Sequence, residues 1–364
     1  MSGALQSPPL PGRVVIFVQG TRVPAARARG FALAHALSQR GVRCEVRAPV
    51  PSVYGDTALP WPLSRLRWCF RPVAAVVRAF QLRDLRGDDV VFFQRPMVEF
   101  PTAIFERVAA RGRASIFDFD DAIFLDLGGR AKLAAIVSTV DHVIAGNSYL
   151  AQAADAPTKT TIIPTVVDTE RFRALPTRDR RNREVVVGWT GLRGNYRQLM
   201  EAYEGLARAL RRTGARLLLI SNGPPPDDLR SLGAEYRPWR EASEIEDLSE
   251  IDIGIMPLPD SPFARGKCAF KLIQYMALAR PAVASPVGAN GEVVTSGENG
   301  FLAQGAAAWE DALVSLIEDP DLRQRMGGKA RRRIEDVYSM NAVLPLYLSA
   351  IERARGRAPH EVSP

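Results

Sequence analysis

The chain has 364 residues, enough for two domains of ordinary size. Apolar residues make up 46% and charged residues 24% of the chain, which excludes a wholly disordered protein, a collagen and a coiled coil. Lysine and arginine outnumber aspartate and glutamate by 48 to 40, and this net charge of +8 suits an anionic partner such as a nucleotide or a phospholipid head group.

Short apolar strands alternate with amphipathic helices along the first half of the chain. Residues 14–18 form an apolar run typical of a buried parallel strand, residues 28–40 carry apolar side chains at helical spacing, and residues 42–48 form the next strand. This strand–helix–strand order predicts a parallel, right-handed crossover. The remaining predicted strands of this series are residues 90–93, 114–119 and 142–145.

A second series of the same kind follows a proline-rich and charged stretch at residues 156–183. Its predicted strands are residues 184–189, 216–221, 253–256 and 281–284, and its predicted helices are residues 196–213, 266–279, 320–337 and 344–355. Two successive blocks of alternating strands and helices predict an α/β protein with two doubly wound, Rossmann-like domains. We place the first at residues 1–176, the second at residues 177–340, and a C-terminal helix and tail at residues 341–364.

Ligands of open parallel sheets bind beyond the carboxyl ends of the strands, so the residues that follow each strand are the candidate site residues. In the first block these are Gly20, the pair Gln94 and Arg95, and the carboxylates Asp118, Asp120 and Asp121. Three carboxylates within four residues repel one another unless they are solvated, paired or bound to a cation. One of them as a helix N-cap is the alternative, purely structural interpretation.

The densest cluster of charge in the second block is Arg265, Lys267 and Lys271 near the start of the helix predicted at residues 266–279. Lys267 and Lys271 are four residues apart and are expected on one helix face, where like charges are unfavourable unless an anion lies between them. A helix N-terminus itself attracts anions, so basic side chains at this end indicate a bound phosphate. A glycine-containing loop follows the next strand and can present backbone N–H groups to an anion; it comprises Gly288, Ala289, Asn290, Gly291 and Glu292.

These features resemble the GT-B glycosyltransferases, specifically the retaining family 4 type. The stretch DIGIMPLPDSPFARGKCAFKLIQYMALARPAVASPVGANGEVV carries most of the resemblance, and HVIAGNSYLA, IIPTVVDTERF and VVVGWTGLRGNYRQL agree with it. The resemblance implies two Rossmann-like domains facing across a cleft, with the C-terminal helix packing back on the first domain. It also implies transfer of a sugar from a nucleoside-diphosphate donor in that cleft to a hydroxyl acceptor, with retention, without a metal ion and without a cofactor.

The same resemblance assigns roles to individual residues. Lys271 and Lys267 would meet the diphosphate, together with Arg265, while Gly191 would let the backbone approach the donor. The loop from Gly288 to Glu292 would face the sugar, and Gln274 would contact the ribose where many relatives carry a glutamate. Both glutamates of the usual family pattern are absent here, because their places fall on Gly266 and Gln274. On the acceptor side we expect Gly20, Gln94 and Arg95, with Asp120 or Asp121 acting on the acceptor hydroxyl.

Several features bear on where the protein acts. The three cysteines, Cys44, Cys69 and Cys268, are widely separated, and neither a signal peptide nor an apolar run of about 18 residues is visible, which predicts a cytoplasmic protein. Residues 61–86 combine aromatic and aliphatic side chains with six arginines, and we hypothesise a peripheral contact with the inner face of the plasma membrane. An ordinary core-facing helix is the alternative, and no motif indicates nucleic-acid binding.

The expected acceptor is a sugar, a lipid-linked molecule or a small molecule with a hydroxyl group, in cell-envelope polysaccharide, glycolipid or secondary-metabolite glycosylation. Three other functions stay open. The stretch IFDFDDAIF is similar to the first motif of haloacid-dehalogenase phosphatases, with Asp118 as nucleophile and Asp120 as general acid, although Ala122 replaces its usual threonine. The same aspartates are similar to the metal-binding triplet of GT-A glycosyltransferases. Loss of both family glutamates also fits a GT-B protein that binds a nucleotide-sugar without turnover.

Overall fold

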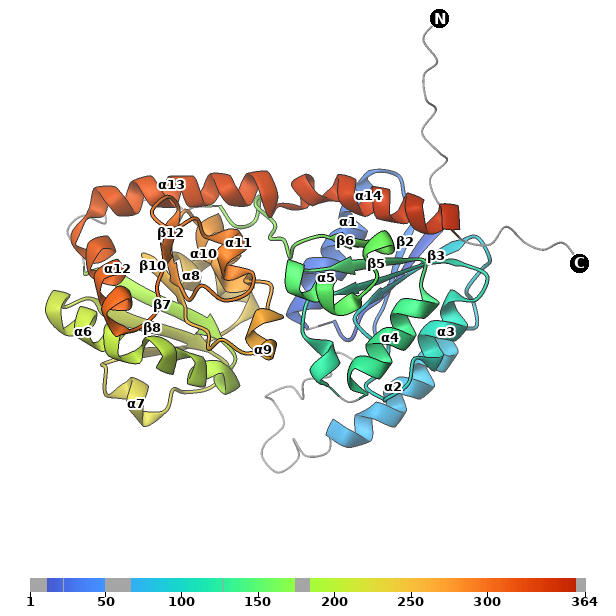
Figure 1. The fold of residues 1–364 in the computed structure, drawn as a ribbon, viewed down its shortest axis with the longest axis horizontal. Coiled ribbons are helices and arrows are strands. Elements are labelled where there is room, and N and C mark those ends of the chain that lie inside the picture. Colours follow the sequence, from blue (N-terminus) through green and yellow to red (C-terminus); the bar gives the residue numbers. More distant parts are fainter. Residues whose placement is uncertain (1–11, 22, 50–66, 127, 174–183, 358–364) are drawn as a thin grey trace, which may run out of the picture. The chain divides into compact units, whose positions relative to one another are not determined.

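The computed structural model of the chain describes residues 12–21, 23–49, 67–126, 128–173 and 184–357. It divides into two compact units, one made of Met1–Thr165 and Val343–Pro364 and the other of Val166–Ala342. Each unit is built on a parallel six-stranded sheet with helices packed on it, as the doubly wound α/β prediction requires (Figure 1). The predicted boundary at residues 176/177 falls outside the described residues, and the two units divide at residues 165/166.

The first unit is a sheet of strands in the order β2-β1-β3-β4-β5-β6. Its elements in chain order are β1 (Arg13–Phe17), η1 (Ala26–Phe31), α1 (Ala32–Gln39), β2 (Cys44–Arg47), α2 (Arg67–Gln81), β3 (Asp89–Gln94), α3 (Ile104–Ala110), β4 (Ala114–Phe119), η3 (Ile123–Leu125), α4 (Gly129–Thr139), β5 (His142–Ala145), α5 (Ser148–Ala154), η4 (Pro157–Lys159) and β6 (Thr160–Ile162). Strand β1 has β2 on one side and β3 on the other, so the strand order reverses there. This switch point directs attention to the residues that follow β1, β3 and β4.

The second unit is a sheet of strands in the order β12-β11-β10-β7-β8-β9. Its elements are β7 (Val186–Gly191), η5 (Arg193–Ala202), α6 (Tyr203–Thr213), β8 (Arg216–Ser221), α7 (Asp227–Arg230), β9 (Glu235–Pro238), η6 (Glu241–Ser243), α8 (Glu244–Ser249), β10 (Ile253–Met256), α9 (Pro262–Arg265), α10 (Phe270–Ala277), β11 (Ala282–Ala284), α11 (Asn290–Val293), β12 (Gly300–Leu302), α12 (Ala306–Glu318) and α13 (Pro320–Val337). Here the order reverses between β7 and β10, so the carboxyl ends of these strands and of β11 are the expected ligand edge.

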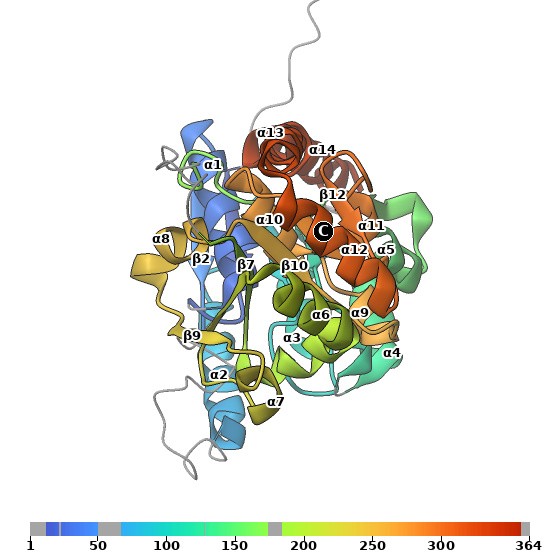
Figure 2. The ribbon, with the colours of Figure 1, turned by 90° about the vertical axis from the view of Figure 1, so that its left-hand side faces the viewer.

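The central strands of both sheets are buried and mostly apolar because both of their faces are covered. In β1 the side chains from Val14 to Phe17 are at most 1% exposed, and in β7 Trp189 is fully buried. In the second unit, one core cluster includes Trp189, Leu206 and Trp309, and helix α6 packs against α12 there (Figure 2). A separate cluster joins α10 to α13.

The last helix, α14 (Met340–Arg357), belongs to the first unit from Val343 onward. Its Tyr347 is fully buried, and the Tyr347 ring centroid lies 6.2 Å from that of Phe92 in β3. The C-terminal helix therefore packs against the first sheet. Among the described residues, no helix combines the length and the apolar composition that crossing a membrane requires.

Three predicted helices are subdivided in the structure. The helix expected at 28–40 is the π-helical turn η1 followed by α1, and the helix expected at 196–213 is the 3₁₀ segment η5 followed by α6. The helix expected at 266–279 is interrupted: α9 ends at Arg265 and α10 begins at Phe270, after Ala269 in the left-handed region at φ 53°. Hydrophobic periodicity alone does not detect such breaks, because the apolar positions keep nearly the same spacing through them.

Candidate active site

At the carboxyl end of β7, a glycine leaves room for a lysine and a tryptophan. The Lys271 ammonium of α10 lies 4.3 Å from the Trp189 ring centroid. A Cβ placed on Gly191 would come within 2.7 Å of Trp189 Cζ2 and 2.9 Å of Lys271 Nζ, so no larger residue fits without displacement. The Thr190 N–H donates to Tyr275 Oη at 2.8 Å, which ties α10 to the same strand end. The strand, the helix and the glycine therefore fix Lys271 at the ligand edge of this sheet.

The Lys271 side chain forms no hydrogen bond or ion pair with any described residue. Burial of its ammonium, and next the positive charge of Lys267, lower the pKa of Lys271 to about 7. The indole N–H of Trp189 is also buried there and has no hydrogen-bond partner among the described residues. A desolvated cation without a counter-ion is unfavourable, so an anionic ligand would relieve this arrangement.

Lys267 is not on the helix face of Lys271, contrary to the prediction from their spacing. It lies before the start of α10, separated from Phe270 by the left-handed Ala269, and its ammonium is 4.4 Å from the Phe263 ring centroid. Lys267 nevertheless acts on Lys271 by electrostatic repulsion. The two positive charges are therefore brought together by the turn between α9 and α10, and not by one turn of helix.

Arg265 is half-exposed and lies at the end of α9. It forms a bidentate ion pair with Asp260, with N–O distances of 2.6 and 2.8 Å. Gly288 adopts φ 54°, and a Cβ on it would lie 2.7 Å from the Arg265 carbonyl oxygen. The loop after β11 therefore packs directly against the backbone of the Arg265 turn, as only glycine permits here.

The predicted sugar-facing loop divides into a buried and an exposed part. Asn290 is 1% exposed, and its amide donates to the carbonyls of Ser285 (3.0 Å) and Met256 (3.3 Å), which fastens the loop to the end of β10. Ala289 is buried, while Gly291 and Glu292 are exposed. The side chain of Asn290 thus serves the loop's own conformation, and a donor-binding role for this loop stays a prediction.

Gln274 is 4% exposed on α10, one turn after Lys271. Its Nε2 donates to Glu244 Oε1 at 3.1 Å, and Glu244 Oε2 lies 4.0 Å from Arg171 Nη2. Glu244 begins α8 and is 5% exposed. Sequence analysis did not identify Glu244, because a glutamate in a run of acidic residues at 241–250 gives no signal that it is buried.

In the first unit, Asp118 is committed to a buried ion pair. Arg29 lies on the π-helical turn η1 and points into the first unit. The Arg29 guanidinium donates to both carboxylate oxygens of Asp118, at 2.9 Å to Oδ2 and 2.5 Å to Oδ1. Both side chains are fully buried. Burial alone would lower the pKa of Arg29, but the charge of Asp118 raises it well above the ordinary value. Asp118 therefore has no exposed oxygen with which to attack a phosphate ester, and the proposed nucleophile of a haloacid-dehalogenase phosphatase is wrong.

Asp120 and Asp121 share a different arginine, Arg95. Its Nε donates to Asp120 Oδ1 at 2.6 Å, and its Nη2 is 3.6 Å from Asp121 Oδ2. Burial tends to raise the pKa of Asp120, but the Arg95 charge and hydrogen bond outweigh it and the pKa is lowered. The Asp121 side chain is more exposed, at 29%, and its Oδ1 accepts the Ala122 N–H.

The other acceptor-side residues lie at the same edge. Gln94 ends β3 and is fully buried, and its Nε2 is 3.4 Å from Asp120 Oδ1, while its Oε1 has no partner among the described residues. Arg95 adopts φ 64°, and its N–H donates to the Asp118 carbonyl. Gly20 is buried after β1, and its carbonyl accepts the Val23 N–H.

Arginines neutralise the three carboxylates that the sequence places in four residues. The ranges covered by the structure contain no group of three or more His, Cys, Asp or Glu side chains able to hold a metal ion. A metal-binding triplet of the GT-A kind is not formed by these aspartates, because Asp118 faces Arg29 and Asp120 faces Arg95.

Comparison with known proteins matches residues 184–319 to the family Glycosyl transferases group 1. The chain carries a glycosyl transferases group 1 domain. This family match identifies the protein as a glycosyltransferase. No curated protein matches the chain in sequence.

Solved structures similar to this glycosyltransferase share its GT-B fold at low sequence identity. HepE of Anabaena, solved with UDP and glucose, has a TM-score of 0.66 at 15% identity and covers 93% of this chain and 99% of its own. Sucrose-phosphate synthase of Thermosynechococcus elongatus has a TM-score of 0.67 at 16% identity, covering 95% and 100%. The lipopolysaccharide outer core galactosyltransferase WaaB has a TM-score of 0.64 at 14% identity, covering 93% and 99%.

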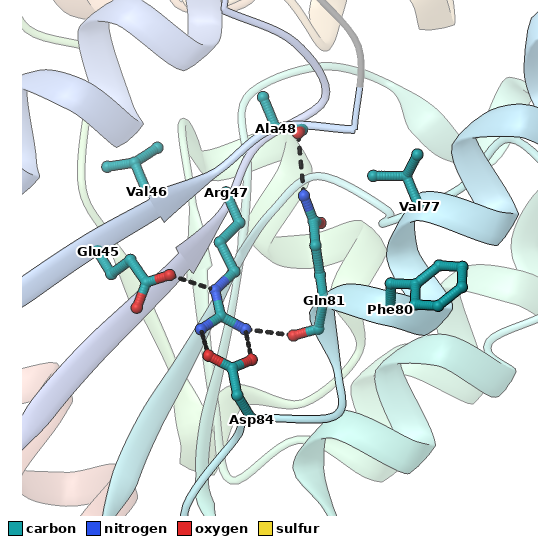
Figure 3. A pocket seen from close by; sticks show the side chains of 8 residues that line it. All are labelled: Glu45, Val46, Arg47, Ala48, Val77, Phe80, Gln81 and Asp84. Atoms are coloured by element: carbon teal, nitrogen blue, oxygen red, sulfur yellow. Dashed lines mark hydrogen bonds and ion pairs between the residues drawn. The ribbon is translucent and has the colours of Figure 1, made fainter.

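A hollow of about 420 Å³ in the first unit of the glycosyltransferase is lined by none of the predicted donor-side or acceptor-side residues (Figure 3). Residues of β2 and α2 line it, and Arg47 occupies its polar side, bonded to Glu45, Asp84 and the Gln81 carbonyl. These polar groups satisfy one another, so the hollow presents no unpaired charge to a substrate.

Proposed function

We propose that the protein transfers a sugar from a UDP-sugar to a hydroxyl acceptor, with retention of anomeric configuration. The observation that carries this proposal is the half-buried Lys271 ammonium at the carboxyl end of β7, which has no counter-ion among the described residues. The group 1 domain and the UDP bound in HepE support the choice of donor. The product would enter cell-envelope polysaccharide, glycolipid or secondary-metabolite glycosylation.

The chemistry follows from where charge develops. Cleavage of the bond between sugar and diphosphate builds negative charge on the departing UDP, and a fixed cation at that position lowers the barrier. Lys271 and Lys267 supply this charge in the proposal, so transfer proceeds without a divalent cation. Arg265, Gly191 and the loop Gly288–Glu292 complete the donor site as proposed from the family resemblance.

A two-stage assay tests the proposal. Thermal unfolding of the full chain with UDP, GDP, ADP and dTDP identifies the nucleotide, because a ligand of the native state raises the apparent Tm by mass action. Radiolabelled UDP-sugars with soluble sugar and lipid-diphosphate acceptors then test transfer, with and without EDTA. Binding of UDP without transfer to any acceptor would favour the catalytically silent nucleotide-sugar-binding protein, and absence of any binding would contradict both.

On the acceptor side we propose Asp121 as the carboxylate that orients or deprotonates the acceptor hydroxyl, and Asp120 as the residue that holds Arg95. Asp121 is the more exposed of the two, and Arg95 is closer to Asp120. Asp121→Asn is expected to lower kcat by about 100-fold or more, as loss of a general base does. Asp120→Asn is expected to lower both kcat and Tm, because it releases a largely buried arginine. Steady-state kinetics with saturating donor measure the effect.

Asp155→Asn is the matched control, because Asp155 is exposed and its left-handed backbone, at φ 50°, suits asparagine equally well. Its kcat should equal that of the wild type. Near-normal turnover of both Asp120→Asn and Asp121→Asn would show that neither carboxylate acts on the acceptor.

We also propose that helix α2 contacts an anionic membrane surface. Residues 61–66 of the predicted segment lie outside the described residues. In the rest of the segment, two arginines do not offer a free positive charge to a membrane: Arg78 is fully buried, and Arg71 pairs with Glu99. An apolar stripe remains, with Val73, Val76 and Phe80 exposed by 51%, 56% and 56% at helical spacing. Arg83 stacks over Phe80, and Arg86 is exposed nearby, so the stripe ends in positive charge.

Replacing two residues of this stripe tests the contact. Val76→Asp with Phe80→Asp is expected to abolish sedimentation of the protein with phosphatidylglycerol vesicles at low salt, because it places charge on the apolar face. Leu346→Asp changes a comparably exposed apolar residue on α14 and should leave vesicle binding intact. Failure of the wild type to bind these vesicles would contradict the membrane contact.

A further inference from the structure

The hydrogen bond between Gln274 and Glu244 decides which end of the Gln274 amide is presented to a ligand. A glutamine side chain has a donating NH₂ and an accepting oxygen, and rotation by half a turn exchanges them. A carboxylate oxygen accepts a hydrogen bond, so the 3.1 Å contact with Glu244 holds the Gln274 Nε2 on the protein side. No described residue donates to Gln274 Oε1, so this oxygen is the group left for a ligand.

We infer that Glu244 is a positioning residue that makes Gln274 a hydrogen-bond acceptor for the ribose hydroxyls of the donor. This inference rests on the proposed function. Gln274 follows Lys271 by three residues on α10, so the two side chains are neighbours along one helix face, about 4.5 Å apart along the axis. In a nucleoside diphosphate, the ribose and its two O–H donors follow the diphosphate. An acceptor one helical turn from the diphosphate cation therefore meets ribose.

Glu244 is itself held in place. It is 5% exposed at the start of α8, and its second carboxylate oxygen lies 4.0 Å from the Arg171 guanidinium. Arg171 lies in a segment that is hydrogen-bonded to α13. The Arg331 guanidinium donates to the carbonyls of Thr169 and Phe172 on either side of Arg171, and to that of Ala277 on α10. The buried carboxylate of Glu244 on α8 thus contacts the amide of Gln274 on α10. The pair places one acidic group at this point of the donor site.

Exchange of the two side chains distinguishes this role from simple packing. Glu244→Gln lets either amide donate to the other, so the Gln274 oxygen is no longer reserved for the ligand. UDP should bind about five-fold more weakly, the effect of one hydrogen bond, while 2′,3′-dideoxy-UDP should bind as it does to the wild type. Gln274→Glu sets two carboxylates against each other and should weaken UDP binding further. The double variant Glu244→Gln with Gln274→Glu restores one donor and one carboxylate, and should bind UDP within about two-fold of the wild type.

Isothermal titration calorimetry of the full chain with both nucleotides measures these affinities. Glu246→Gln, an exposed residue of the same helix, is the matched control and should bind both nucleotides as the wild type does. Equal weakening of UDP and 2′,3′-dideoxy-UDP binding by Glu244→Gln would overturn the inference, as would failure of the double variant to recover. A wild type that binds UDP and its dideoxy analogue equally would overturn the inference and leave the proposed function standing. A wild type that does not bind UDP would overturn the proposed function together with the inference.

Discussion

Lys271→Met is expected to lower kcat/KM by about 100-fold or more and at the same time to raise the Tm of the unliganded protein by about 3 °C. The loss of activity follows because the variant no longer stabilises charge on the departing diphosphate. The gain in stability follows because the wild type holds a desolvated cation beside Lys267, whereas methionine still packs on the Trp189 ring. Steady-state kinetics and thermal unfolding measure the two effects.

The gain in Tm from Lys271→Met should depend on pH, and the pKa of Lys271 gives the direction of this dependence. The pKa of Lys271 is about 7 in the folded protein, below the ordinary lysine value of 10.5. Between these two values the unfolded chain binds more protons than the folded one, so the Lys271 contribution to stability rises with pH. Below pH 7 both states are protonated and the destabilisation is complete. The Tm advantage of Lys271→Met should therefore be largest at pH 6 and shrink as the pH rises from 7 towards 10.

A matched control removes a lysine of the same unit without touching the site. Lys329→Met changes an exposed residue of α13 and should leave kcat/KM unchanged, with no pH-dependent gain in Tm. A Lys271→Met variant that retains wild-type kcat/KM would contradict the assignment of Lys271 to the diphosphate. A variant that loses Tm at every pH would contradict the destabilising cation.

Arg29→Met is expected to lower the free energy of unfolding by about 3–5 kcal/mol. The replacement leaves Asp118 as an uncompensated carboxylate that is fully buried between the sheet of the first unit and its covering helices. Arg29→Met combined with Asp118→Leu should recover most of this loss, because apolar groups of similar volume replace a buried ion pair with little net change. Urea unfolding followed by circular dichroism measures the three proteins.

The exposed pair Arg208 and Glu204 provides the comparison. Their side chains are 47% and 70% exposed on α6, and Arg208→Met should cost less than about 1 kcal/mol. A cost of that size for Arg29→Met would show that the buried pair is solvated in solution. Failure of the double variant to recover would instead show that the hydrogen bond from Arg29 to Thr165 or the shape of Arg29 matters more than its charge.

The sequence alone determined the central architecture. Fully buried parallel strands are continuous apolar runs, and β4, β5, β8 and β10 have the predicted bounds for that reason. The strands it missed, β6, β9 and β12, are edge strands of three or four residues. Each has only one neighbour and partial exposure, so none produces an apolar run.

The candidate site divides in the same way. Loops after buried strands are found from the order of strands, which is how Arg95 and the aspartates were selected as candidates. Lys271 was selected from the basic cluster near a predicted helix start, and Gly191 from the family resemblance. Which charge meets which partner depends on residues far apart in the chain. Asp118 pairs with Arg29 across 89 positions, and Gln274 with Glu244 across 30. A local sequence pattern carries no information on such pairs, because only the packing of one element on another brings the two side chains together. The tertiary structure therefore decides whether a carboxylate is a reactive group or one half of a buried ion pair.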